Sequence, residues 1–133
     1  MSNEQLNIIF WIALIGTFLS TRGLAQSAVP LIDASELQAQ LQADSSVVVL
    51  DTRSPEEYQA GHLANARFVN YATFRLSDVQ DIAKETPIVV YCLSGGRSGR
   101  VAQQLLNAGY ESVKNLNGGI RNWQVAGFNV IQE

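Results

Sequence analysis

An α/β fold is indicated most directly by residues 87–109, PIVVYCLSGGRSGRVAQQLLNAG. The run PIVVY is apolar and β-branched without alternation, which is typical of a parallel strand buried on both faces. A glycine-rich loop follows, and residues 98–108 then place apolar side chains four positions apart, which predicts an amphipathic helix. Gly109 is placed to end that helix. This order predicts that Cys92, the only cysteine, lies at the carboxyl end of a buried strand.

The alternation of strands and helices extends to both sides of this stretch. Residues 47–50, VVVL, form a second continuous apolar run and predict another buried strand. Asp33 and Ser54 are placed as helix N-caps. Further strands are expected at residues 28–32, 66–69 and 112–116, and further helices at 34–43, 55–60, 73–83 and 120–125. The pattern predicts an α/β fold with a mainly parallel central sheet and helices on both faces.

Polar residues and glycines follow three of the predicted strands. Asp51 comes directly after VVVL, Cys92 after IVVY, and residues 117–118 after the strand at 112–116. The carboxyl ends of parallel strands share one edge of the sheet, where open α/β folds bind their ligands. These residues are therefore expected to meet at one candidate site.

The loop after Cys92 has the composition of an anion-binding loop. Gly95 and Gly96 permit backbone geometries that turn successive N–H groups inward. The helix predicted to begin near Ser98 adds the positive end of its dipole, and Arg97 adds a permanent cation. Such surroundings lower a thiol pKa from about 8.5 and favour a nucleophilic thiolate. The alternative, an inert buried cysteine, does not explain why these features converge. The expected loop residues are Leu93, Ser94, Gly95, Gly96, Arg97 and Ser98.

Composition excludes several classes of function. The chain has 133 residues, of which 47% are hydrophobic and 16% charged, as in one ordinary globular domain. Its net charge of −3 argues against nucleic acid as a partner. One cysteine cannot form an internal disulfide, and one cysteine with one histidine cannot supply a usual zinc site. No metal is expected, and a monomer is the expected state.

The first 25 residues differ from the rest of the chain. Residues 8–19, IIFWIALIGTFL, are apolar and uncharged, and small residues follow at 23–25. This predicts a secretory signal peptide at 1–25, a domain at 26–133 and a periplasmic or otherwise extracytoplasmic location. The amino-terminal seven residues lack Lys and Arg, unlike a usual signal peptide. An uncleaved membrane anchor at residues 5–21 is the alternative.

Several separate motifs resemble the single-domain rhodanese family of sulfurtransferases. Residues 51–53 (DTR) and 57–63 (EYQAGHL) resemble its first motif, and residues 89–98 (VVYCLSGGRS) its active-site loop. Residues 118–130 resemble its carboxyl-terminal signature. Asn65 stands where the family commonly has glycine, and could alter the following turn.

The resemblance implies a mechanism and roles for the site residues. A Cys92 thiolate would take sulfane sulfur from a donor such as thiosulfate, hold it as a persulfide and pass it to cyanide or a thiol. Residues 93–98 would bind the sulfur anion, and Arg97 would support the loop and the anionic donor. Apart from the resemblance, the position of Asp51 at a strand end could suit a base, but a carboxylate held by backbone N–H groups or by an arginine, shaping the site floor, is favoured. Arg53 is the expected partner of Asp51. The resemblance implies no cofactor beyond the cysteine persulfide, and small-molecule partners only.

Two alternatives remain open at this stage. A rhodanese-like module can be a non-enzymatic interaction domain or a persulfide carrier, although the presence of Cys92 argues against pure binding. Related phosphatases and arsenate reductases carry five residues between the cysteine and the arginine, whereas four separate Cys92 from Arg97 here. The shorter loop favours a single sulfur atom over a tetrahedral oxyanion.

Other residues that could attract a catalytic interpretation are expected to have simpler roles. His62, the only histidine, is expected to be structural. Arg100 is expected to be solvated. Tyr58 and Trp123 are expected in the core. A rim for anionic donors is a further possibility for Arg67, Arg75 and Arg121.

Overall fold

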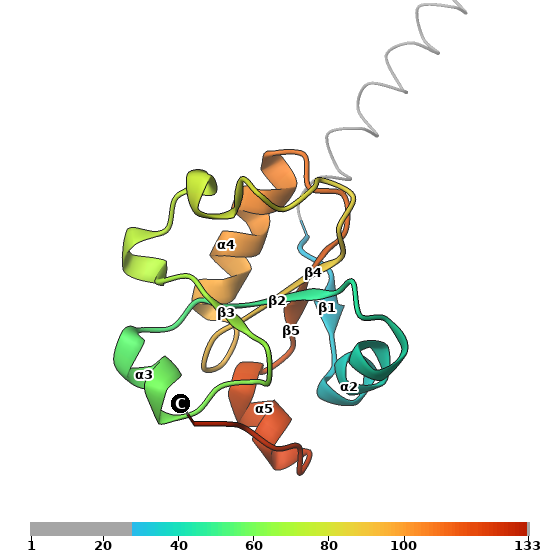
Figure 1. Cartoon of the computed structure of the whole chain (residues 1–133), viewed down its shortest axis with the longest axis vertical. Helices are drawn as coiled ribbons and strands as arrows, with labels where there is room; N and C mark the ends of the chain where they lie inside the picture. The colour runs from blue at the N-terminus through green and yellow to red at the C-terminus, as the bar shows by residue number, and fades with distance from the viewer. Residues whose placement is uncertain (1–27, 133) are drawn as a thin grey trace, which may run out of the picture.

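The computed structural model describes residues 28–132, and the predicted segment at 1–25 lies outside them. Within the described part, five strands form one all-parallel sheet in the order β1-β5-β4-β2-β3 (Figure 1). The strands are β1 (Leu31–Ile32), β2 (Val48–Asp51), β3 (Arg67–Phe68), β4 (Ile88–Tyr91) and β5 (Val113–Leu116). The α-helices are α2 (Ala34–Ala43), α3 (Pro55–Ala60), α4 (Gly96–Asn107) and α5 (Gly119–Val125).

Helices cover both faces of the sheet, as predicted. Side chains of a strand alternate between faces, so Val49 and Val89 contribute to the core beneath α2 and α5. Leu50 and Val90 contribute to the opposite core, which includes the apolar side of α4. Figure 1 shows α2 and α5 together on one side of the sheet, with α4 on the other. Burial on both faces explains the continuous apolar runs in β2 and β4.

The prediction of an α-helix at residues 73–83 is wrong. The structure has two 3₁₀ helices there, Tyr71–Thr73 and Leu76–Val79. The Asn70 side chain accepts a hydrogen bond from the backbone N–H two residues later, and Asp78 accepts one from the N–H three residues earlier. Such local bonds compete with α-helical pairing and favour short turns.

Several boundaries also differ from the sequence prediction. Helix α4 begins at Gly96 rather than near Ser98, because Gly95 serves as its N-cap with φ 116°. A positive φ is readily available to glycine and rare for other residues. The strands predicted at 28–32 and 66–69 are each two residues long. Asn65 adopts φ 61°, a left-handed conformation that asparagine tolerates better than most residues.

Helices within residues 28–132 lack the length and apolar character needed to span a bilayer.

Candidate active site

Strand pairing brings the predicted site residues to one edge of the sheet. β2 and β4 are adjacent and parallel, with Asp51 in register with Tyr91. The Thr52 N–H extends this pairing by donating to the Tyr91 carbonyl at 3.0 Å. Cys92 therefore begins its loop beside the end of β2, at the carboxyl edge where the sequence placed the site.

The Cys92 sulfur lies against donors from its own loop. Sγ accepts a hydrogen bond from the Gly95 backbone N–H at 3.1 Å and one from the Ser98 hydroxyl at 3.3 Å. Cys92 is 2% exposed, and the left-handed Gly95 turns the chain into the first turn of α4. Sγ therefore lies near the positive end of a 12-residue helix.

These contacts favour the thiolate. Burial of Sγ opposes ionisation, but hydrogen bonds from the Ser98 hydroxyl and from the backbone N–H groups of Ser98, Gly95 and Ser94 outweigh it. Together they lower the pKa of Cys92 below its ordinary value. At a given pH, a lower pKa increases the fraction of thiolate, which is the nucleophilic form of cysteine.

Helix α5 holds the other side of the same loop. The backbone N–H of Ile120 donates to the Cys92 carbonyl at 2.9 Å, and that of Arg121 donates to the Leu93 carbonyl at 3.2 Å. Gly119 permits this approach, because a Cβ there would lie 2.5 Å from both carbonyl oxygens. The first two carbonyls of the loop thus bond α5, while the Gly95 N–H bonds the sulfur.

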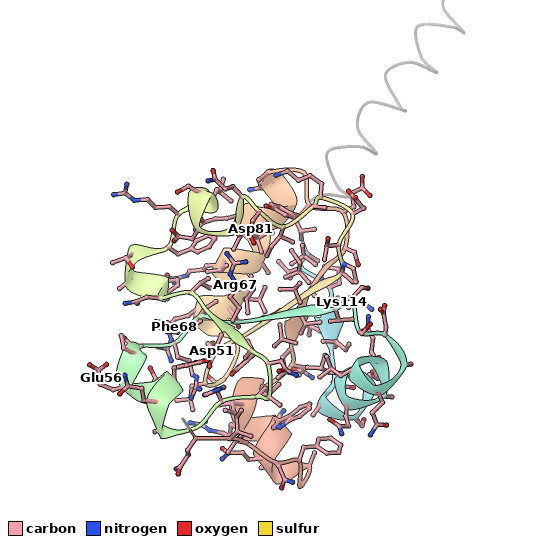
Figure 2. All side chains as sticks on the ribbon, in the orientation of Figure 1. Asp51, Glu56, Arg67, Phe68, Asp81 and Lys114 are labelled. Atoms are coloured by element: carbon pink, nitrogen blue, oxygen red, sulfur yellow. The ribbon has the colours of Figure 1, made fainter. Side chains whose placement is uncertain are left out.

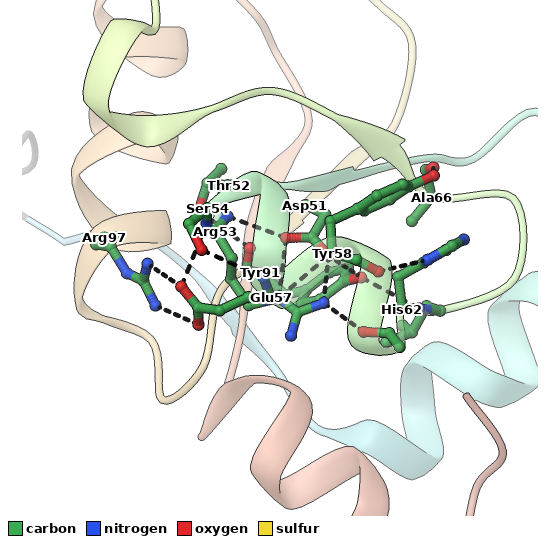
Figure 3. Close-up of polar contacts among 12 residues, drawn as sticks. Asp51, Thr52, Arg53, Ser54, Glu57, Tyr58, His62, Ala66, Tyr91 and Arg97 are labelled. Atoms are coloured by element: carbon green, nitrogen blue, oxygen red, sulfur yellow. Dashed lines mark hydrogen bonds and ion pairs between the residues drawn. The ribbon is translucent and has the colours of Figure 1, made fainter. Parts of the chain in front are cut away.

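Arg97 forms a bidentate ion pair with Glu57 of α3 (Figure 3). The two N–O distances are 2.8 and 3.0 Å. Glu57 also forms a capping box with Ser54, so its carboxylate is fixed from two directions. The Arg97 guanidinium lowers the pKa of Glu57 to about 2. The loop cation is therefore paired with a carboxylate at the same time as it interacts with Cys92.

Asp51 and Arg53 pair beneath the loop, together with Tyr91 (Figure 3). Arg53 contacts both carboxylate oxygens of Asp51 and donates to the Gly61 carbonyl at 2.6 Å. The Tyr91 hydroxyl donates to Asp51 and accepts from the Leu63 N–H at 3.1 Å. Burial, followed by the Asp51 charge, raises the pKa of Tyr91. This network joins β2, β4 and the segment after α3, and supports the residue preceding Cys92.

His62 and Arg100 each contact residues outside the cysteine loop. The His62 ring stacks on Tyr58 at 3.9 Å between centroids, and its backbone pairs with Ile131. Arg100 is exposed and donates to the Tyr71 hydroxyl at 3.1 Å.

Arg67 and Asp81, labelled in Figure 2, form an ion pair with an N–O distance of 2.8 Å. The possible rim of arginines therefore lacks Arg67, whose guanidinium is committed to this pair and to the Asp78 carbonyl.

Three features of the site were not predicted from the sequence. They are the pairing of Glu57 with Arg97, the contact of Asn115 with Ser98, and the close approach of Gly119 to the loop carbonyls. The first two join residues 40 and 17 positions apart, and no local pattern marks such pairs. A glycine directly after Gly118 was the only signal for the third.

A recess of about 610 Å³ lies elsewhere, between α2 and the end of α5. Leu41, Val49, Leu63, Trp123 and Phe128 are among its lining residues, and Cys92 is not. Residues 28–132 also contain no cluster of three or more His, Cys, Asp or Glu side chains suited to a metal ion.

Known proteins resemble this chain in sequence and in fold. Residues 33–126 match the rhodanese-like domain family. A thiosulfate sulfurtransferase, GlpE of Coxiella burnetii, is 36% identical over 92 residues, covering 68% of this chain and 84% of that protein. The structure of a rhodanese-related protein from Thermoplasma volcanium has 26% identity and a TM-score of 0.70, covering 78% of this chain and 99% of that one.

A thiosulfate sulfurtransferase structure from Pseudomonas aeruginosa has 32% identity and a TM-score of 0.69. The alignment covers 78% of this chain and 20% of that larger protein. With the family match extending from Asp33 to Ala126, across the sheet, the cysteine loop and α5, the chain belongs to the family of rhodanese-like domains.

Proposed function

We propose that this chain is a sulfurtransferase that moves sulfane sulfur from thiosulfate, or a similar donor, to a thiophilic acceptor through a persulfide on Cys92. The proposal rests on one observation, that Cys92 Sγ accepts hydrogen bonds from the Gly95 N–H and the Ser98 hydroxyl. The names of the relatives from Coxiella burnetii and Pseudomonas aeruginosa support the choice of donor.

The proposed reaction has two displacements. The Cys92 thiolate attacks the outer sulfur of thiosulfate, a sulfur–sulfur bond forms to Sγ, and sulfite leaves with the electron pair of the broken bond. The terminal sulfur of the persulfide then carries the negative charge. Cyanide, or a thiolate acceptor, attacks that sulfur, and the Cys92 thiolate is restored. The reaction would show the ping-pong kinetics of covalent catalysis.

The loop supplies what both displacements need. Its inward N–H groups stabilise negative charge on Sγ, and in the persulfide they would face the transferred sulfur. Arg97 would support the loop through Glu57 and present the outer part of its guanidinium to an anionic donor. No additional cofactor enters this scheme, and the partners are small molecules.

The proposal is tested by incubating the full-length protein with thiosulfate and measuring its intact mass. We expect a gain of one sulfur atom, located on Cys92 by peptide mapping and lost when cyanide is added, with thiocyanate released. Cys92→Ser, checked for folding by circular dichroism, is expected to show neither change. A wild-type protein that gains no sulfur, or a Cys92→Ser variant that turns over normally, would contradict the mechanism. Hydrolysis of an aryl phosphate without sulfur transfer would instead indicate a phosphatase.

We also propose an extracytoplasmic location, which rests on the apolar amino-terminal sequence described above. Mass spectrometry of the fractionated cell is expected to find a chain that starts near residue 26 in the extracytoplasmic fraction. A chain beginning at Met1 and retained with membranes would support the anchor instead.

A further inference from the structure

Asn115 lies on β5 beneath the cysteine loop and is only 7% exposed. Its side-chain amide makes two hydrogen bonds, both to the loop. Oδ1 accepts from the Ser98 hydroxyl at 2.6 Å, and Nδ2 donates to the Gly95 carbonyl at 3.0 Å. The carbonyl can only accept, so the amide nitrogen must face Gly95, and this fixes the oxygen toward Ser98.

Both partners of Asn115 carry donors to the Cys92 sulfur. Gly95 donates its N–H to Cys92 Sγ at 3.1 Å, and Ser98 donates its hydroxyl at 3.3 Å. We propose that Asn115 is a positioning residue, which aims the Gly95 N–H and the Ser98 hydroxyl at Sγ by holding both residues from below. It acts on the sulfur through these two residues.

The Ser98 hydroxyl is central to this role because it has one proton and two acceptors. While Cys92 is a neutral thiol, the shorter contact directs that proton to Asn115 Oδ1. Once Cys92 ionises, a hydrogen bond to the charged sulfur is the stronger one, and the hydroxyl turns to Sγ. While Cys92 is neutral, the bond to Asn115 Oδ1 thus holds the Ser98 oxygen beside Sγ, and the Nδ2 bond to the Gly95 carbonyl holds the loop in both charge states.

The surrounding backbone leaves room for this side chain. A Cβ at position 99 would lie 3.2 Å from Asn115 Nδ2, closer than an ordinary contact, and Gly99 avoids that crowding. Gly95 itself needs its positive φ to present its N–H to the sulfur and its carbonyl to Asn115. Asn115, Gly95 and Gly99 therefore form one packed support for the loop.

The test compares Asn115→Leu, which keeps the branched shape of the side chain and removes both hydrogen bonds, with Asn107→Leu as a matched control. Asn107 is the last residue of α4, and its side chain accepts a hydrogen bond from Gln103 at 3.0 Å on the exposed surface. The measurement is the rate of Cys92 alkylation by iodoacetamide as a function of pH. We expect the midpoint for Asn115→Leu to rise by about one unit, which lowers the rate roughly tenfold at neutral pH. Asn107→Leu is expected to keep the wild-type midpoint.

A second variant keeps the test decisive if Asn115→Leu does not fold. Asn115→Asp keeps the shape and the acceptor for Ser98, but it cannot donate to Gly95 and adds negative charge, so its midpoint is also expected to rise. A folded Asn115→Leu or Asn115→Asp protein with the wild-type midpoint would overturn the assignment. The inference concerns the site of the proposed sulfur transfer, but alkylation requires no sulfur donor. Failure of wild type to form a persulfide would therefore reject the proposed function without deciding the role of Asn115.

Discussion

Replacing Gly119 with alanine tests how tightly the cysteine loop is held against α5. The new Cβ would lie 2.5 Å from the carbonyl oxygens of both Cys92 and Leu93. These are backbone atoms, so the contact cannot be relieved by rotation of a side chain. Either the loop or the start of α5 must move, which weakens the hydrogen bonds that Ile120 and Arg121 donate to the same carbonyls.

The expected magnitude comes from comparison with Gly127→Ala. Gly119 and Gly127 both have positive φ, 61° and 85°, so alanine carries a left-handed backbone cost at each, about 1–2 kcal/mol. A Cβ at Gly127 meets nothing within 4 Å. Overpacking typically costs about 1–3 kcal/mol, and a weakened hydrogen bond adds about 1 kcal/mol. Gly119→Ala should therefore reduce the free energy of unfolding by roughly 2–4 kcal/mol more than Gly127→Ala.

The assay is equilibrium urea unfolding of wild type and both variants, followed by far-UV circular dichroism. Cys92 alkylation measured on the folded variants adds a local report, and we expect it to change for Gly119→Ala alone. The two alanine variants could lose the same free energy of unfolding to within about 0.5 kcal/mol, close to the usual spread for independent sites. The contact between the new Cβ and the loop carbonyls would then not lower the stability. The reasoning from the 2.5 Å approach would then be refuted.

Two further substitutions test the ion pair and the buried network. Glu57→Gln should lower stability by about 1 kcal/mol at neutral pH, because the pair with Arg97 is partly exposed. The pKa of Glu57 falls from 4.5 to about 2 on folding, so the stability that its carboxylate contributes is present above pH 4.5 and is lost as the pH falls toward 2. Urea unfolding measured across that pH range should show the difference in stability between Glu57→Gln and wild type disappear. Tyr91→Phe removes a donor to the buried Asp51 carboxylate and should cost about 1–3 kcal/mol in the same assay, and an unchanged midpoint would show that this hydroxyl does not stabilise the network.

The sequence predicted those parts of the fold that depend on local patterns. The run IVVY identified β4 because a strand buried on both faces needs continuous apolar side chains. The Ser54 capping box identified the start of α3 for a similarly local reason. The helix expected at 73–83 failed because Asn70 and Asp78 bind nearby backbone groups, and apolar spacing alone does not reveal that competition.

The location of the candidate site could be predicted from the sequence, but most of the contacts within it could not. Cys92 and its loop could be located because they follow a buried strand in a parallel sheet. Which side chain each loop residue contacts could not be predicted, since the partners come from other elements. Arg97 was expected to be the cation of the loop, but its pairing with Glu57 of α3 was not predicted. Ser98 was expected to begin a helix, and its hydroxyl instead lies between Cys92 and Asn115.

The contact between α5 and the loop carbonyls has a consequence for the order of events during synthesis. Cys92 leaves the ribosome before Ile120 and Arg121, whose N–H groups hold the Cys92 and Leu93 carbonyls. Asn115 on β5 also follows Cys92 along the chain. A nascent chain that ends before these residues carries the thiol without the supports that orient it. The loop can therefore take up the arrangement seen in the folded domain only after β5 and α5 have been synthesised.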